Sequence, residues 1–208
     1  ANRNFVNKLW NATRFVLMHT GGKDFPIPSE FELEDKWILT RLNTVIGEMT
    51  ENLERFELGI AAQKIYDFIW DDFCDWYIEL VKPRLTGEDE KAANGARGVL
   101  LHVLSGILKL LHPFMPFVTE EIWQSLPGTS GNLITSAWPA CDSSRLFPSD
   151  AETMTRVMTA IRGVRNRRSE MNVHPAKKTR LLIVTDDKTP YENGRHYIEK
   201  LAGASEIG

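Results

Sequence analysis

The 208-residue sequence has few of the features that mark enzymes and membrane proteins. It contains no run of about eighteen apolar residues, which a membrane helix needs, and no signal peptide. Its two cysteines, Cys74 and Cys141, lie in unrelated surroundings, which favours reduced thiols in the cytoplasm over a disulfide. It also has no glycine-rich phosphate loop, no Ser-His-Asp order and no zinc-ligand spacing. We therefore expect no catalytic residue, no metal, no cofactor and no membrane association in this chain.

A strong excess of charge is also absent, but the charge that is present is unevenly distributed. The formal net charge is −3. Residues 1–23 nevertheless hold four basic residues and no acidic one, and residues 156–180 hold eight basic residues against Glu170 alone. An acidic protein with such basic segments can present them to RNA while the rest of its surface repels other polyanions. A surface of mixed charge with no such partner is the alternative.

The first eighteen residues predict an amphipathic helix. At about 100° per residue, Phe5, Leu9, Ala12 and Val16 share one side, which Val6, Trp10, Thr13 and Leu17 widen, so all eight are expected in the core. The opposite side is basic and rich in amides, and it consists of Arg3, Asn4, Asn7, Lys8, Asn11 and Arg14, with Phe15 as an exposed aromatic among them. Such a face can hold phosphates, contact base edges and stack a base. An ordinary solvated helix surface is the alternative.

Four more helices are expected before residue 127. Apolar spacing predicts helices over about 34–55, 58–81, 88–111 and 117–126, after a loop over 19–30. The third helix is apolar on most of its circumference, which places it in the middle of a bundle, and Pro83 is expected to stop it. Its aromatic group is expected in the core, with Trp70 and Trp76 both buried.

The composition changes after Leu126, and a second unit is expected to follow. Leu133, Ile134 and Trp138 are the expected anchors of a connector. Beyond it, a helix around 154–164, a strand over 180–185 and a helix over 191–202 predict a small α/β appendage. A single strand leaves its edges unpaired, so the appendage reads as truncated, with a poorly anchored last helix. The fold class is thus mainly α, with a helical bundle and connector over 1–150 and a partial α/β appendage over 151–208.

Two other patterns in the bundle could be taken for sites. Asp67, Asp71, Asp75 and Glu79 recur every four residues and could bind a metal or act as paired carboxylates, but no His or Cys joins them at a usable spacing, so a solvated stripe is expected. His112 precedes Pro113 and could act as a base, but a helix cap or a satisfied buried histidine is expected instead.

Several long motifs resemble the anticodon-binding helical domain of valyl-tRNA synthetases, which are class I aminoacyl-tRNA synthetases. These motifs are NKLWNATRFVLM from Asn7, DKWILTRLN from Asp35, YDFIWDDFCDWYIELVKP from Tyr66, LLHPFMPFVTEEIWQSL from Leu110, the AWP turn at Ala137, and IRGVRNRRSEMNVHPAKK from Ile161. Together they cover nearly the whole chain. The chain, which begins with alanine, therefore resembles a piece of a longer ligase of protein biosynthesis.

The resemblance implies both a function and its division between domains. The parent enzyme would join valine to its cognate tRNA with ATP and Mg²⁺ in a catalytic domain whose HIGH-type and KMSKS-type sequences are absent here. This fragment would bind the anticodon stem-loop of valine-specific tRNA, would be inactive alone, and would belong to a cytoplasmic, monomeric enzyme. The tRNA-binding positions that it implies are Asn7, Lys8, Asn11, Arg14 and Phe15, with Trp10 in the core. A secondary tRNA contact is expected at Arg162, Arg165, Arg167 and Arg168. The alternative is a helical interaction or structural module that binds no RNA.

Overall fold

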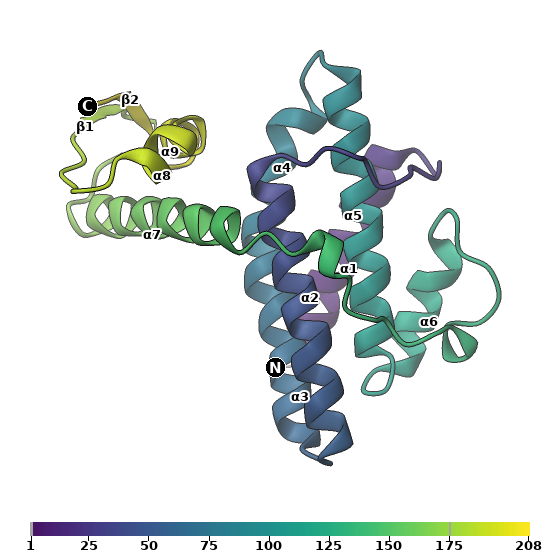
Figure 1. Ribbon diagram of the computed structural model, residues 1–208. Helices are drawn as coiled ribbons and strands as arrows, with labels where there is room; N and C mark the ends of the chain where they lie inside the picture. Colours follow the sequence, from purple (N-terminus) through teal and green to yellow (C-terminus); the bar gives the residue numbers. More distant parts are fainter. Residues whose placement is uncertain (1, 175) are drawn as a thin grey trace. The chain divides into compact units, whose positions relative to one another are not determined.

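The computed structural model describes residues 2–174 and 176–208 and is mainly α-helical (Figure 1). The chain divides into two compact units, residues 1–146 and 147–208, which are described separately. No helix in the described part of the chain combines the length and the apolar character needed to cross a membrane.

The first unit is a bundle with α5 at its centre. Its helices are α1 (Asn2–Thr20), α2 (Leu33–Glu54), α3 (Leu58–Asp67), the π-helix η1 (Phe68–Tyr77), α4 (Ile78–Leu85), α5 (Glu90–Leu111) and α6 (Pro116–Ser125). Helix α5 contacts α1, α2, α6 and the α3 and α4 segments of the third expected helix, and that third helix contacts α1, α2 and α5, so both lie inside the bundle. The apolar side chains of α5 are buried almost all round, as this position requires.

The third expected helix is continuous but not regular. Its middle ten residues form the π-helix η1, in which the backbone bonds span five residues instead of four. Trp70 and Asp75, five residues apart, therefore lie near one face of the helix, where both contact Lys8. Trp76 is 7% exposed, as predicted, but Trp70 is only half-buried, which corrects the prediction for that residue. Pro83 lies inside α4 and does not stop it.

A buried ionic cluster joins α2 to α4. One Arg84 nitrogen, Nη1, donates to Glu34 Oε1 at 2.8 Å and to Asp35 Oδ2 at 2.7 Å. The Tyr77 hydroxyl donates to Asp35 Oδ1 at 2.7 Å. Burial disfavours the guanidinium charge, but the two carboxylates outweigh it and hold the pKa of Arg84 above its usual value. The bundle therefore depends on this arginine, because its loss would leave two buried carboxylates without a cation.

The connector lies on the bundle at fewer points than expected. Leu133, in the short 3₁₀ helix η2 (Leu133–Thr135), is buried, but Ile134 is 74% exposed and is not an anchor. Trp138 is partly exposed, and its indole N–H donates to Thr50 Oγ1 at 2.9 Å. Near η3 (Ser143–Arg145), the Asn43 side chain accepts from the Asp142 N–H and donates to the Arg145 carbonyl.

The second unit consists of one long helix, two short helices and a two-stranded parallel sheet. These are α7 (Pro148–Glu170), β1 (Thr179–Leu181), α8 (Thr189–Asn193), α9 (Arg195–Leu201) and β2 (Ala204–Ile207), and Thr179 pairs with Ala204 and Leu181 with Ile207. The expected strand over 180–185 is shorter than predicted, and it has a partner in β2. Tyr197 and Ile198 are buried, so α9 is anchored, contrary to the prediction. The expected helix over 191–202 breaks at Gly194, where an added Cβ would lie 2.2 Å from Val157 Cγ2 on α7.

Candidate functional site

Helix α1 buries one side in the bundle and presents the other to solvent. Phe5, Leu9, Ala12 and Val16 are buried as predicted. The Thr13 hydroxyl donates a hydrogen bond to the Leu9 carbonyl. The exposed side carries five of the predicted residues, namely Arg3, Asn4, Asn7, Asn11 and Arg14. We call these five the α1 face. No Asp or Glu occurs on α1, and neither arginine of the α1 face forms an ion pair with any described residue. The face therefore has two cations and three amides available to a ligand.

Trp10 also lies beside the α1 face, although the sequence placed it in the core. Its side chain is 39% exposed. On a helix of 3.6 residues per turn, position 10 falls next to positions 3 and 14, at the border between the buried and exposed arcs. Helical spacing alone puts this border residue on the edge of the apolar arc, and the packing around α1 leaves it partly exposed.

Lys8 does not point outward, which corrects the prediction for that residue. Its ammonium lies 2.5 Å from Asp75 Oδ1 and 3.7 Å from the centroid of the Trp70 ring. Trp70 stacks in turn on Tyr66, and Tyr66 on Phe5, so Lys8 ends a column of rings between α1 and the third helix. Its charge is compensated within the bundle, and we leave it out of the α1 face.

Phe15 was predicted to be exposed, but it is half-buried in the structure. Its ring centroid lies 4.5 Å from that of His19, and the Lys82 ammonium lies 5.9 Å from the Phe15 centroid. Burial, with help from Arg97 and Lys82, lowers the pKa of His19. This imidazole is therefore neutral at neutral pH and adds no positive charge beside the ring.

The residues considered as metal or acid-base groups have structural partners. Asp75 binds Lys8, Glu79 pairs with Lys82, and Asp67 accepts from Gln63. No group of three or more metal-ligating side chains occurs among the described residues. His112 caps α5, as expected, and its Nδ1 lies 2.7 Å from Thr119 Oγ1. Both cysteines are free, and burial raises the pKa of Cys74 to about 12, so its thiol stays protonated.

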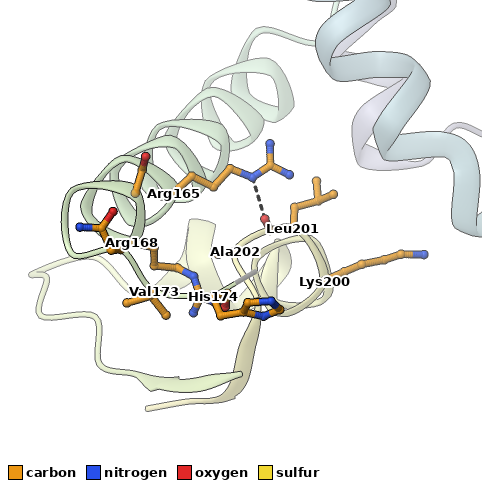
Figure 2. A pocket seen from close by; sticks show the side chains of 10 residues that line it. Arg165, Arg168, Val173, His174, Lys200, Leu201 and Ala202 are labelled. Carbon is orange, nitrogen blue, oxygen red and sulfur yellow. Dashed lines mark hydrogen bonds between the residues drawn. The ribbon is translucent and has the colours of Figure 1, made fainter. Parts of the chain in front are cut away.

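The four arginines of the expected secondary contact differ in their surroundings. Arg165 and Arg168 line a cleft in the second unit, together with residues of α9 and the loop after α7 (Figure 2). Arg167 pairs with Glu170 at 3.0 Å and lies outside this cleft, as does Arg162. The sequence groups these four arginines in one segment and does not indicate which of them face α9.

The α1 face can hold a nucleic acid, and the relatives of the chain show which kind of domain carries it. The profile of the family described as "Anticodon-binding domain of tRNA ligase" matches residues 35–183. The chain belongs to this family. The α1 face itself lies ahead of the matched residues, so its role in this anticodon-binding domain rests on its own chemistry.

Along its whole length, this chain is similar to one part of valine–tRNA ligases. It is 49% identical to the valine–tRNA ligase of Clostridium acetobutylicum and 47% identical to that of Clostridium perfringens, in both cases over 212 residues that cover all of this chain. It spans 24% of the length of each of these relatives. Among solved structures, it is similar to a leucyl-tRNA synthetase (LeuRS) of Agrobacterium radiobacter K84, solved in a ternary complex with tRNA and LeuAMS. That match has a TM-score of 0.52 and 22% identity, and covers 71% of this chain and 17% of the other, so it supports the fold alone.

Proposed function

We propose that the α1 face, with Trp10 and Phe15 at its borders, holds the anticodon loop of a tRNA. The proposal rests on the two arginines of the face. Arg3 and Arg14 are exposed, have no carboxylate partner in the described chain, and lie on a helix without acidic residues. Elsewhere on the bundle, exposed arginines such as Arg55 are paired, in that case with Glu51 at 2.6 Å.

Each group on the face has a distinct role in this proposal. The guanidinium groups of Arg3 and Arg14 bind phosphates, because charge-assisted bonds to phosphate oxygens set the position of a nucleic acid. The amides of Asn4, Asn7 and Asn11 each offer both a donor and an acceptor to base edges. Trp10 or Phe15 stacks an unpaired anticodon base. Lys8 contacts no ligand in this proposal, because its charge is already paired with Asp75.

The parent protein is, in this proposal, a monomeric cytoplasmic valine–tRNA ligase. Its catalytic domain would use ATP and Mg²⁺ to join valine to valine-specific tRNA. The anticodon-binding domain would hold the tRNA so that its acceptor end reaches that distant site, which is a contribution of positioning, not bond chemistry. The isolated fragment would show no aminoacylation. The identity to valine–tRNA ligases over the whole chain supports this assignment.

The test is a filter-binding titration of the 208-residue chain with valine-specific tRNA over a range of salt concentrations. The Arg14→Ala variant should bind more weakly, and the slope of log affinity against log salt should fall by about one unit, because one phosphate contact is lost. The Arg55→Ala variant removes an exposed arginine that is already paired and should leave both quantities unchanged. A valine-specific tRNA with an altered anticodon should bind the parent chain more weakly than the unaltered one.

Two results would contradict the proposal. If folded Arg14→Ala binds as the parent does, the anticodon loop is held elsewhere. If the parent chain binds neither tRNA at low salt, the bundle serves as an interaction or structural module that needs no RNA.

A further inference from the structure

The second unit contains a cleft whose lining is unusually basic. It lies between the end of α7, the loop at 172–174 and the end of α9, and has a volume of about 630 Å³. Figure 2 shows Arg165 reaching from α7 towards Leu201 on one side, and Arg168 lying beside His174 on the other. None of the described residues that line the cleft is acidic, whereas Arg165, Arg168 and Lys200 are cationic.

Arg168 is fixed in the cleft without losing its charge. Its Nη1 donates to Thr179 Oγ1 at 3.1 Å, and its Nη2 donates to the carbonyls of His174 and Lys177. All three acceptors are neutral oxygens. These bonds hold the guanidinium in place, and no carboxylate of the described chain neutralises it.

Arginines of the same unit that lie outside the cleft are paired with acids. Arg156 binds Glu152 at 2.8 Å and Asp187 at 3.2 Å, Arg167 binds Glu170, and Arg195 binds Glu199 at 2.9 Å. Arg168 differs from these three arginines in having no carboxylate partner among the described residues. An anion is the ligand that would balance its charge.

Further donors lie around Arg168. Arg165 Nε donates to the Leu201 carbonyl at 2.7 Å, which holds that side chain across the end of α9. Lys200 is exposed at the rim, directed outward in Figure 2, and forms no ion pair with the described residues. His174 Nδ1 accepts the Ala176 N–H at 3.2 Å, so the neutral ring carries its proton on Nε2, where it can donate.

We propose that this cleft binds the phosphodiester backbone of RNA, as a contact additional to the α1 face. The inference rests on the proposed function, since the ligand is the same tRNA. The cations are spread along an open cleft and do not converge on one point, which suits successive phosphates of a strand better than one free phosphate ion. Phosphate contacts of this kind set position without reading sequence.

The test uses Lys200, because this exposed side chain can be replaced without loss of a bond that the structure describes. In the filter-binding assay at physiological and higher salt, Lys200→Ala should reduce the salt slope by about one unit, and Lys200→Glu should weaken binding further. The matched controls are Arg167→Ala and Arg167→Glu, in the same basic segment but outside the cleft. Their effect should be much smaller, because the Arg167 charge is already balanced by Glu170. The double variant Arg14→Ala/Lys200→Ala should lose the sum of the two slopes.

The outcomes separate this inference from the proposed function. Equal effects of Lys200→Glu and Arg167→Glu, together with weaker binding by Arg14→Ala, would overturn the cleft and leave the α1 face in place. A parent chain that binds no RNA would overturn both. In a second arm, NMR shifts of the cleft residues are followed as inorganic phosphate replaces chloride at constant ionic strength. Phosphate binding that Lys200→Glu abolishes, with RNA binding unaffected, would identify a free-anion site and overturn the RNA assignment.

Discussion

Trp10 and Phe15 lie on opposite sides of the α1 face, and both are able to stack a base. Trp10 is 39% exposed beside Arg3 and Arg14, so part of its ring packs on the bundle and part is open to solvent. Phe15 is half-buried, and its ring contacts His19 and lies near the Lys82 ammonium. A base can stack on the open side of either ring, and both rings also contribute to the packing of the bundle.

Replacement of either ring by alanine should therefore affect both tRNA binding and stability. Trp10→Ala should weaken tRNA binding by about 1–3 kcal/mol with an unchanged salt slope, because stacking is lost and charge is not. Its melting temperature should also fall, because the covered part of the ring is lost from the packing. Phe15→Ala should lower the melting temperature as well as the affinity, because a half-buried ring is removed. Filter binding and thermal melts measure both quantities.

Phe117→Ala is the control for loss of an exposed aromatic ring. Phe117 is 91% exposed on α6 and lies outside the α1 face, so its removal should alter neither affinity nor salt slope. If Phe15→Ala alone weakens binding, Phe15 is the stacking residue and Trp10 is not.

Helix α5 has a glycine, Gly98, at a position where helix propensity alone would favour alanine, because the backbone of Pro26 lies against it. An added Cβ on Gly98 would lie 2.2 Å from the carbonyl oxygen of Pro26 and 3.0 Å from its carbonyl carbon. Both atoms are backbone, so the loop after α1 would have to move. The end of α1, just before that loop, is also tied to α5 through Arg97, whose Nε donates to the His19 carbonyl at 2.9 Å.

Gly98→Ala should therefore destabilise the bundle although alanine is the better helix former. The clash should cost about 1–3 kcal/mol, more than the roughly 1 kcal/mol that helix propensity returns. Gly47→Ala on α2 is the matched control, because an added Cβ there meets nothing within 4 Å. It should stabilise by about 0.4–1 kcal/mol. Urea unfolding of both variants decides the point, and a stabilised Gly98→Ala would show that the loop is not packed on α5.

The stability of the whole bundle should depend on pH through His102. Burial, followed by the nearby charges of Arg145 and Lys109 and opposed by Asp142, lowers the pKa of His102 to about 4. Arg145 Nη1 lies 3.1 Å from His102 Nε2, which therefore accepts from the guanidinium in the neutral ring. The unfolded chain binds a proton near pH 6.5, whereas the folded chain resists it. Stability from this group is complete above pH 6.5 and is lost as the pH falls towards 4.

Denaturant unfolding at several pH values should show this loss, with an upper limit of about 3 kcal/mol. His102→Gln cannot titrate, and its amide oxygen can still accept from Arg145. Its unfolding free energy should therefore fall less steeply between pH 6.5 and 4 than that of the parent. Carboxylates and His19 titrate in both proteins, so the difference between the two curves isolates His102. Parallel curves would mean that His102 becomes protonated in the folded state at no cost.

Periodicity predicted the five helices of the bundle to within about two residues at nearly every end, because an apolar stripe every three to four residues must be buried wherever the helix packs. Residue type also predicted the basic, carboxylate-free side of α1, and the long motifs carried the resemblance to anticodon-binding domains. The exposure of Trp10, the inward turn of Lys8, the π-helix over 68–77 and the division of the four arginines between cleft and surface needed the tertiary structure. Each depends on which atoms of a distant segment lie opposite: Asp75 and Trp70 draw Lys8 inward, and Leu201 and Thr179 hold Arg165 and Arg168. Such partners are 11 to 67 residues apart in the chain, and no local pattern encodes their meeting.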